Sequence, residues 1–163
     1  MQEHIETVRA FYNQGAAYEW ARLEKHPFEF LLTTWMMDRY IRPGDAVLDI
    51  GGGPGRYSIY FAEKGCAVTL AELSEGNAAF AREKAAEAGV TLTAHAVNCL
   101  DLETLGLGQF DHVFLMGPLY HLLEEEDRVR AVEIALRHLK PGGQLYASFI
   151  LLFAGILYDL QNE

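Results

Sequence analysis

Three parts of the sequence bring together residue types that could bind and process a nucleotide-type ligand. The first is a glycine-rich turn after a short apolar run, Asp49-Ile50-Gly51-Gly52-Gly53-Pro54-Gly55. The second is Glu72, which ends the next apolar run 21 residues after Gly51, and the third is Tyr120-His121, in a loop after a later apolar run. Glycines let a ligand lie against the main chain, and an acid at this distance accepts hydrogen bonds from both ribose hydroxyls. Glu72 could instead cap the next helix, but Ser74 already provides that cap.

The spacing of the glycines narrows the kind of ligand. A dinucleotide fingerprint has glycine at its first, third and sixth positions, whereas the sixth position here is Arg56. No Gly-Lys-Ser/Thr follows the turn, so the stretch is not a P-loop. A tight strand-to-helix connection without a ligand is the alternative for such a turn.

The elements around these residues alternate between strand and helix. Apolar runs predict five strands, and amphipathic or alanine-rich stretches predict the helices between them, which is typical of a parallel sheet in an α/β fold. The strands are expected at 46–50, 66–73, 91–97, 110–116 and 144–150, and the helices at 57–64, 74–89 and 124–139, with a tight turn at 140–143. Residues 1 to about 40 are expected to be helical and divided at Pro27, and the second of these helices, which carries Leu31 and Trp35, is expected to cover the sheet.

From Tyr12 to Phe149 the chain resembles the Rossmann-like (class I) S-adenosylmethionine-dependent methyltransferases. The turn from Asp49 to Gly55 is similar to that family's first motif, acid-x-Gly-x-Gly-x-Gly, and a helix followed by Pro141-Gly142-Gly143 and a strand is another of its features. Gly117-Pro118-Leu119-Tyr120-His121-Leu122 resembles a loop of a bacterial subset. The resemblance implies a three-layer sandwich with a mostly parallel central sheet, a helical lid segment over residues 1–44 and a cofactor-binding core over residues 45–163.

The resemblance also implies which residues contact S-adenosylmethionine and its product S-adenosylhomocysteine. The lid residues Tyr12, Tyr18 and Arg22 would contact the methionine end, with Arg22 paired to its carboxylate. Alternatively, the aromatic residues pack in the core and Glu19 pairs with Arg22 on a helix surface. Asn98 stands where the family usually has an Asp that binds the adenine amino group. The Asn98 side-chain carbonyl can still accept a hydrogen bond from that amino group, and the next backbone amide would donate to a ring nitrogen. The remaining expected contacts are Asp49, Gly51, Gly52, Gly53, Gly55, Glu72, Leu73, Cys99, Met116 and Gly117.

His121 and Tyr120 are the acid-base candidates, because their loop follows the strand that flanks the expected switch point of the sheet. A neutral imidazole could take a proton from a methyl acceptor or merely orient it. The alternative is a structural histidine at a helix start. The sulfonium of the cofactor is already activated, so the expected methyl transfer needs alignment and desolvation and has no obligatory base.

Composition disfavours several other classes of function. The 163 residues carry 13 basic and 23 acidic side chains, a net charge of −10, which opposes a nucleic-acid partner. Cys66 and Cys99 provide neither a disulfide framework nor a zinc site, so no metal is expected and the cytoplasm is the expected compartment. No signal peptide or membrane span is expected either. A small molecule is therefore the expected methyl acceptor.

The sequence stops where the resembled fold usually adds a helix and two antiparallel strands. Residues 151–163 suffice for one helix, so the fifth strand is expected at an uncovered apolar edge. A truncated chain, a partner chain such as a second copy in a homodimer, or a naturally minimal fold would each explain this. Two other functions stay open: a non-catalytic module that binds S-adenosylmethionine or S-adenosylhomocysteine, and an NAD(P)-dependent oxidoreductase.

Overall fold

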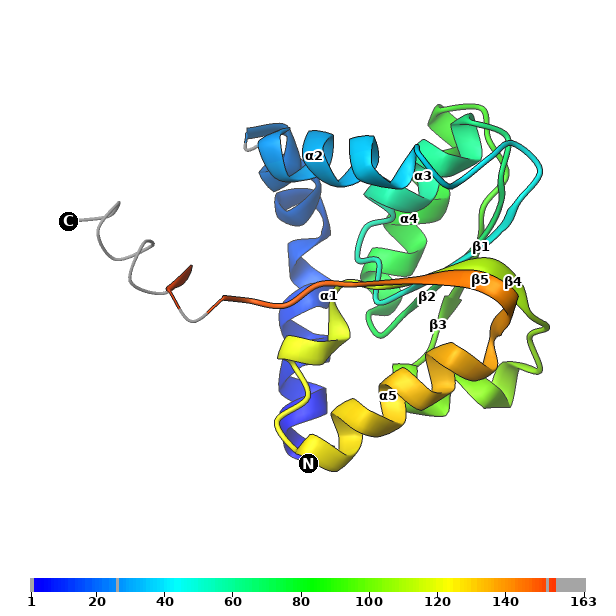
Figure 1. Cartoon of the computed structure of the whole chain (residues 1–163). Helices are drawn as coiled ribbons and strands as arrows, with labels where there is room; N and C mark the ends of the chain where they lie inside the picture. Colours follow the sequence, from blue (N-terminus) through cyan, green and yellow to red (C-terminus); the bar gives the residue numbers. More distant parts are fainter. Residues whose placement is uncertain (1, 26, 152, 155–163) are drawn as a thin grey trace.

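The computed structural model describes residues 2–25, 27–151, 153 and 154, and its elements form three layers around a five-stranded sheet (Figure 1). In chain order these elements are α1 (Gln2–Lys25), α2 (Pro27–Met37), β1 (Ala46–Ile50), α3 (Arg56–Glu63), β2 (Ala67–Glu72), α4 (Glu75–Glu87), β3 (Thr93–Ala96), the 3-10 helix η1 (Cys99–Leu105), β4 (Phe110–Leu115), the 3-10 helix η2 (Pro118–Tyr120), α5 (Glu125–Arg137) and β5 (Leu139–Ala147).

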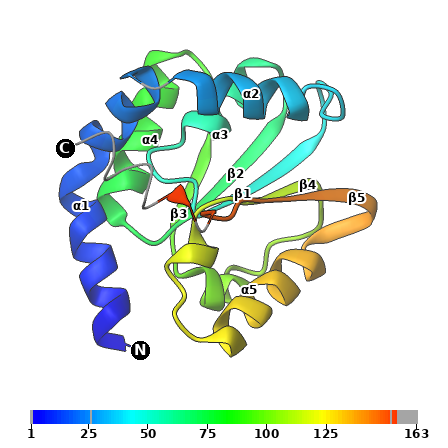
Figure 2. The ribbon, with the colours of Figure 1, turned by 60° about the vertical axis from the view of Figure 1, so that its left-hand side comes forward.

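The strands lie in the order β3-β2-β1-β4-β5, and every strand pair among the described residues is parallel. The chain leaves β1 toward β2 on one side and later returns to β4 on the other side, so the switch point lies between β1 and β4 (Figure 2). In open α/β sheets, ligands bind beyond the carboxyl ends of the strands at this point. This fold confirms the predicted Rossmann-like architecture, with a fully parallel sheet in the described part of the chain.

The two faces of the sheet bury alternate residues of β1, as the pleat requires. Val47 packs with Phe61 of α3 and with Met37 of α2. Leu48 and Ile50 point to the opposite face, where they join the core formed with α5 and η1. Asp49 shares the face of Val47, so its carboxyl group is directed toward α3 rather than toward α5.

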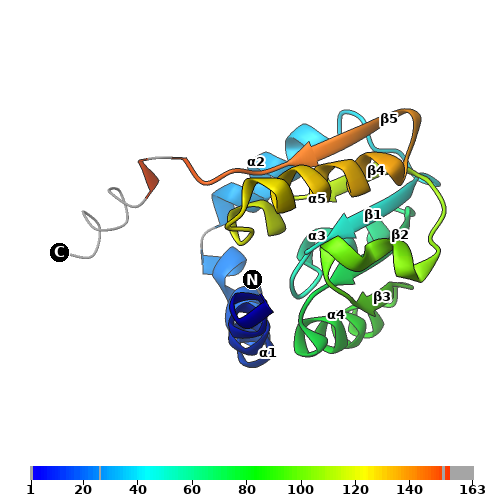
Figure 3. The ribbon, with the colours of Figure 1, turned by 90° about the horizontal axis from the view of Figure 1, so that it is seen from below.

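Helix α1 lies beside α4 and extends past the carboxyl ends of the strands (Figures 2 and 3). The side-chain oxygen Oδ1 of Asn13 accepts hydrogen bonds from the Ser74 hydroxyl at 2.7 Å and from the Gly76 amide at 3.1 Å. A Cβ on Gly76 would lie 2.7 Å from the carbonyl oxygen of Asn13, so only glycine allows this close approach. The start of α4 therefore holds α1 over the end of the sheet that the switch point predicts as a site.

One expectation about secondary structure and one about helix packing need correction. The turn 140–143 lies inside β5, which begins at Leu139 and shifts its register on β4 between the pairs Phe110–Leu139 and His112–Gln144. Gly142, at φ 82°, lets the chain make this detour without breaking the strand. The expected cover of the sheet by α2 holds at Met37, which packs with Val47 and Phe61. Leu31 and Trp35 are 61% and 60% exposed and take no part in that cover.

Other expectations lie beyond what the structure tests. Most of the helix expected over residues 151–163 falls outside the described residues. The division into segments 1–44 and 45–163 stays a prediction. In the part of the chain that the structure describes, no helix is long and apolar enough to cross a membrane.

Candidate functional site

The glycine turn after β1 forms the floor of a cavity, and its glycines serve different purposes. Gly51, Gly52 and Gly53 line the cavity, whereas Gly55 does not. Gly53 has φ 57°, and a Cβ there would meet nothing nearer than the Asn77 side-chain nitrogen at 4.0 Å, so a longer side chain has room to enter the cavity. A Cβ on Gly55 would lie 2.8 Å from the Cβ of Ala81, so Gly55 permits helix packing. Gly55 therefore has a packing role, and its expected ligand contact stays a prediction.

Asp49 is a fully buried acid beside this turn. Its carboxylate accepts a hydrogen bond from the Ser58 hydroxyl at 2.7 Å. Burial raises the pKa of Asp49 to about 7, the Ser58 hydrogen bond lowers it, and the charge of Glu72 raises it further. The same carboxyl group therefore changes charge near neutral pH, at a position that lines the cavity.

Glu72 joins the end of β2 to the glycine turn. Its Oε2 accepts from the Gly53 amide at 3.0 Å, and its Oε1 accepts from the Ser74 amide at 3.0 Å and from Nδ2 of Asn77 at 3.4 Å. Burial raises the pKa of this carboxyl, and the hydrogen bonds from Ser74, Gly53 and Asn77 oppose that shift. The acid predicted to bind ribose is thus fixed in place by three donors.

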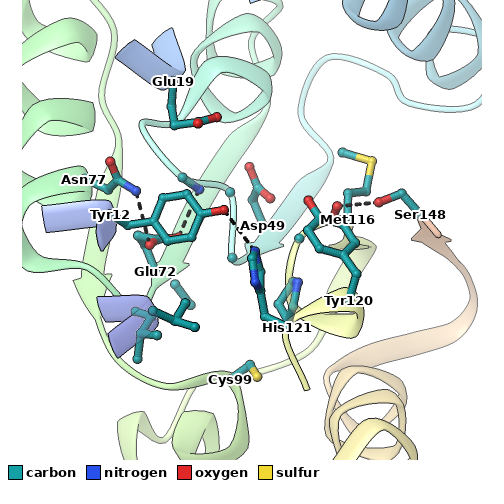
Figure 4. Close-up of a pocket in the computed structure, with 18 of the residues that line it drawn as sticks. Tyr12, Glu19, Asp49, Glu72, Asn77, Cys99, Met116, Tyr120, His121 and Ser148 are labelled. Carbon is teal, nitrogen blue, oxygen red and sulfur yellow. Dashed lines mark hydrogen bonds between the residues drawn. The ribbon is translucent and has the colours of Figure 1, made fainter. Parts of the chain in front are cut away.

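These groups face one cavity of about 610 Å³ at the carboxyl ends of the strands (Figure 4). This volume falls in the range of small-molecule sites, roughly 300–1,000 Å³. Fourteen of the sixteen residues predicted for the site line it, and they come from α1, the turn after β1, the end of β2, the start of η1 and the loop after β4: Tyr12, Arg22, Asp49, Gly51, Gly52, Gly53, Glu72, Leu73, Asn98, Cys99, Met116, Gly117, Tyr120 and His121.

Tyr18, like Gly55, does not line the cavity, and its side chain is 68% exposed. On an α-helix, six residues correspond to a rotation of about 240°. Tyr12 faces the cavity, so Tyr18 points elsewhere. Tyr18 therefore lies outside the cavity, and its predicted lid contact stays a prediction.

Arg22 lines the cavity but is already paired with two carboxylates. Its Nε donates to Glu19 at 3.1 Å and its Nη1 donates to Glu29 of α2 at 3.0 Å. Both acids also line the cavity. The pairing of Arg22 with Glu19 occurs as the helix-surface alternative expected, while Arg22 remains exposed to the cavity. Its predicted pairing with a ligand carboxylate stays a prediction.

Tyr12 and His121 meet across the cavity. The Tyr12 hydroxyl lies 2.9 Å from Nε2 of His121 (Figure 4). Nε2 of His4 lies 3.0 Å from the His121 carbonyl oxygen. Burial, followed by the charge of His4, lowers the pKa of His121, and burial raises the pKa of Tyr12 to about 12. At neutral pH the pair therefore consists of a neutral imidazole and a protonated phenol.

Tyr120 extends the aromatic wall next to His121. The two rings have centroids 4.8 Å apart, and burial raises the pKa of the Tyr120 phenol. Its hydroxyl therefore stays protonated at neutral pH and could donate a hydrogen bond rather than remove a proton. The catalytic roles predicted for Tyr120 and His121 stay predictions.

Asn98 and Cys99 lie where the adenine contact is expected. Oδ1 of Asn98 accepts from the Leu100 amide at 3.0 Å and so caps η1. A carbonyl oxygen has two lone pairs, which leaves one for a ligand. Burial raises the pKa of the Cys99 thiol to about 12, so this side chain is neutral and unreactive.

Asn77 is a site residue that sequence reasoning missed. It lies fully buried on α4 and lines the cavity, and its carbonyl oxygen Oδ1 has no hydrogen-bond partner. A buried acceptor without a partner is rare in folded proteins. The only sequence signal is its place in the first turn of the helix that follows Glu72.

The cavity fits a nucleoside ligand such as S-adenosylmethionine on two observations. Gly53 leaves open space beside the main chain, and Glu72, held by the Gly53 and Ser74 amides, lines the same wall of the cavity. The described residues include no group of three or more His, Cys, Asp or Glu that could hold a metal ion.

Comparisons with known proteins agree with this geometry. A family model described as a methyltransferase domain matches residues 47–143. The chain is 33% identical over 125 residues to a ubiquinone biosynthesis O-methyltransferase of Pseudomonas aeruginosa, and 32% identical to that of Pseudomonas syringae pv. tomato. Each alignment covers 77% of this chain and 53% of the relative, so the chain spans about half the length of the curated relatives it matches.

Solved structures resemble the chain in fold. A TehB-like S-adenosylmethionine-dependent methyltransferase from Corynebacterium glutamicum superposes with a TM-score of 0.72 and 20% identity, covering 94% of this chain and 83% of that protein. Magnesium protoporphyrin IX methyltransferase from Synechocystis PCC 6803, solved with S-adenosylhomocysteine, gives 0.71 and 20% identity over 98% of this chain and 78% of that protein.

Proposed function

The chain belongs to the methyltransferase-domain family, and from this premise we propose that it binds S-adenosylmethionine and transfers the methyl group to a small-molecule acceptor. The observation that carries the proposal is the hydrogen bond from the Gly53 amide to Glu72. It joins the glycine turn to the acid that binds ribose hydroxyls, so both face one cavity. The oxidoreductase alternative has no comparable support.

The binding roles follow from the positions of the lining residues. The Glu72 carboxylate accepts hydrogen bonds from the ribose hydroxyls. The Asn98 carbonyl accepts a hydrogen bond from the adenine amino group, and the backbone amide of Cys99 donates one to a ring nitrogen. The main chain at Gly51 and Gly53 lies against the ligand, and Tyr12 closes the cavity from α1. Because most of these groups are held by other hydrogen bonds, little reorganisation is needed on binding.

When bound, S-adenosylmethionine supplies an activated methyl group on a sulfonium. His121 would orient an acceptor hydroxyl or amine, or take its proton at Nε2, once the Tyr12 hydroxyl yields that position. The lowered pKa of His121 keeps the imidazole neutral at neutral pH, and in the tautomer in which the Tyr12 hydroxyl donates to Nε2, that nitrogen carries no proton. Tyr120, whose phenol stays protonated, would donate a hydrogen bond to the acceptor.

A small acceptor is supported by charge and by space. The net charge of −10 and the acids Glu19 and Glu29 on the cavity wall oppose a polyanionic acceptor such as RNA or DNA. The cavity has room for a nucleoside and a compact second molecule. The relatives are named for O-methylation in ubiquinone biosynthesis, which supports a hydroxyl acceptor here as a proposal.

A homodimer and a cytoplasmic location belong to the same proposal. In the described residues β5 is an edge strand, and Phe149 and Ile150 beyond it are 71% and 63% exposed. A second copy would cover this edge, and sedimentation velocity would detect it. Cys66 and Cys99 are both free thiols, which suits a reducing compartment.

The proposed function is tested by titration calorimetry followed by a turnover screen. We expect S-adenosylhomocysteine to bind and NAD to give no heat. Methyl transfer to a panel of phenols, catechols and amines then separates an enzyme from a binding module. Binding without turnover on any acceptor would favour the module, and absence of binding would refute the proposal.

A further inference from the structure

Arg56 lines the cavity, yet none of the proposed ligand contacts uses it. It is the first residue of α3 and follows the glycine turn directly, at the position where a dinucleotide fingerprint has glycine. Its side chain is only 22% exposed. A guanidinium that is largely withdrawn from water needs partners, so the contacts of Arg56 indicate its role.

The guanidinium of Arg56 joins both α1 and α2 to the glycine turn. Its Cζ lies 4.3 Å from the ring centroid of Trp20 on α1 and 5.7 Å from that of Phe30 on α2. A cation within about 6 Å of a ring centroid is attracted to the ring, more strongly where water is excluded. Nη1 of Arg56 also lies 3.3 Å from Oε1 of Glu24 on α1. The Glu24 side chain is 55% exposed, so the two aromatic contacts contribute more to this attachment than the ion pair does.

The end of α1 and the start of α2, residues 19–25 and 27–30, form what we call the α1–α2 corner (Figure 1). Arg22 and Glu29 of this corner line the cavity, and Nη1 of Arg22 donates to Glu29 at 3.0 Å. Trp20 lies two positions before Arg22 on the same helix and does not line the cavity. The guanidinium on Trp20 therefore fixes the corner while Arg22 stays exposed to the cavity.

We propose that Arg56 is a positioning residue, which rests on the proposed function. It holds the α1–α2 corner against the cofactor turn and thereby keeps Arg22 where it can pair with the carboxylate of S-adenosylmethionine or S-adenosylhomocysteine. Arg56 acts through Arg22 and does not contact the ligand itself. A nucleoside that lacks the carboxylate therefore binds independently of Arg56.

Lys84 provides a matched control, because it is a second cation near the ring of Trp20. Its Nζ lies 5.9 Å from the centroid of that ring. Lys84 belongs to α4 and does not line the cavity. Its replacement therefore removes a cation from Trp20 and leaves the attachment of the α1–α2 corner to the glycine turn intact.

The test measures by calorimetry the dissociation constants of S-adenosylhomocysteine and of 5′-methylthioadenosine, which lacks the carboxylate. For Arg56→Met, which keeps an unbranched side chain and removes the charge, we expect affinity for S-adenosylhomocysteine to fall about 3- to 10-fold, the range of a cation–π contact. Affinity for 5′-methylthioadenosine should change less than about twofold, the size of a weak surface contact. In Lys84→Met both affinities should stay unchanged. Arg56→Lys, which keeps the charge and loses the planar group, replaces Arg56→Met should that variant fail to fold, and should show the same pattern with a smaller loss.

The double variant Arg22→Ala/Arg56→Met separates positioning from direct contact. If Arg56 acts through Arg22, the double variant binds S-adenosylhomocysteine as tightly as Arg22→Ala alone does. Losses that multiply in the double variant would overturn the proposal, because Arg56 would then act on the ligand without Arg22. Equal losses for the two ligands in Arg56→Met would overturn it as well, because they would indicate a general loosening of the turn. Wild-type protein that binds no S-adenosylhomocysteine would refute the proposed function, whereas wild-type binding with unchanged affinity in Arg56→Met would refute the positioning role alone.

Discussion

The hydroxyl of Tyr12 and Nε2 of His121 lie 2.9 Å apart, although 109 residues separate them in the sequence. This hydrogen bond joins α1 to the loop after β4, and both residues line the cavity. It also occupies the nitrogen that would take a proton from an acceptor, so binding of the acceptor and release of Tyr12 are expected to be coupled.

Removing the Tyr12 hydroxyl tests this coupling. For Tyr12→Phe we expect KM for the acceptor to change by up to about tenfold, because one neutral hydrogen bond is lost while the ring stays in place.

For His121→Ala we expect kcat to fall about 10²- to 10⁴-fold if the imidazole is a general base. Steady-state kinetics on the acceptor from the turnover screen provides both values. His95→Ala, on β3 and away from the cavity, is the control. An unchanged kcat in His121→Ala would remove the histidine from the chemistry.

The pH dependence of turnover should follow His121. Burial lowers its pKa from the ordinary value of 6.5, so the neutral base persists below that pH and turnover declines only at lower pH. The unfolded chain binds this proton more readily than the folded chain, so this group makes stability fall as pH drops through about 6.5. A pH–rate profile with its acid limb at or above pH 7 would contradict the assignment.

Bulk at Gly53 should close the ligand site. We expect Gly53→Arg to abolish calorimetric binding of S-adenosylhomocysteine, because the side chain would extend into the space beside the turn. Gly89 is a matched control with φ 71° and open surroundings outside the cavity. Gly89→Arg introduces the same charge and the same backbone strain, and should leave affinity unchanged. Equal affinity in the two variants would show that the turn does not lie against the ligand.

The Asp49 carboxyl should make the folding stability fall as pH rises from about 4 to about 7. Its pKa is raised to about 7 from 3.8, so the folded chain holds a proton that the unfolded chain releases between these values. Stability therefore falls as pH rises toward 7, and the full penalty persists above 7. For Asp49→Asn we expect a gain of roughly 1–4 kcal/mol at pH 8 and little change at pH 4. Urea unfolding at both pH values measures this.

Asp111 is the opposite case. Lys140 lowers its pKa, so Asp111→Asn should lose stability at pH 8 and lose less at pH 3. The two asparagine variants should thus differ in sign at pH 8. A loss of stability in both variants at that pH would mean that burial does not dominate the Asp49 carboxyl.

Arg22 should recognise the carboxylate of the ligand. For Arg22→Ala we expect affinity for S-adenosylhomocysteine to fall about tenfold, since charge-assisted hydrogen bonds are lost. Affinity for 5′-methylthioadenosine, which lacks that carboxylate, should stay the same. Glu29→Gln weakens the hold on Arg22 and should raise affinity for S-adenosylhomocysteine alone. Equal losses for the two ligands in Arg22→Ala would instead indicate a structural role.

Local sequence patterns predicted the sheet, and the family resemblance predicted most of the cavity wall. The apolar strands and the glycines that follow them determine where backbone turns at the carboxyl edge, so Glu72 and the turn at Gly51–Gly53 could be placed from spacing alone. Helical periodicity in α1 also predicts that Tyr12 and Tyr18 lie on different faces of the helix, because six residues correspond to a rotation of about 240°. Residue type alone, an aromatic side chain in the expected lid, does not contain this information.

Tertiary contacts explain what the sequence did not reveal. The hydrogen bond between Tyr12 and His121 depends on how α1 docks, and no local pattern encodes it. Asn77 was missed because a polar residue in the first turn of a helix normally faces solvent, whereas here α4 turns it into the cavity. Leu31 and Trp35 were placed toward the sheet because α2 is apolar on more than one face.

The most direct test of the account is a crystal structure of the chain with S-adenosylhomocysteine. We expect the ribose hydroxyls at Glu72, the ligand against Gly51 and Gly53, and the adenine beside Asn98. A ligand bound elsewhere, or a turn whose space is filled by side chains, would contradict the central claim.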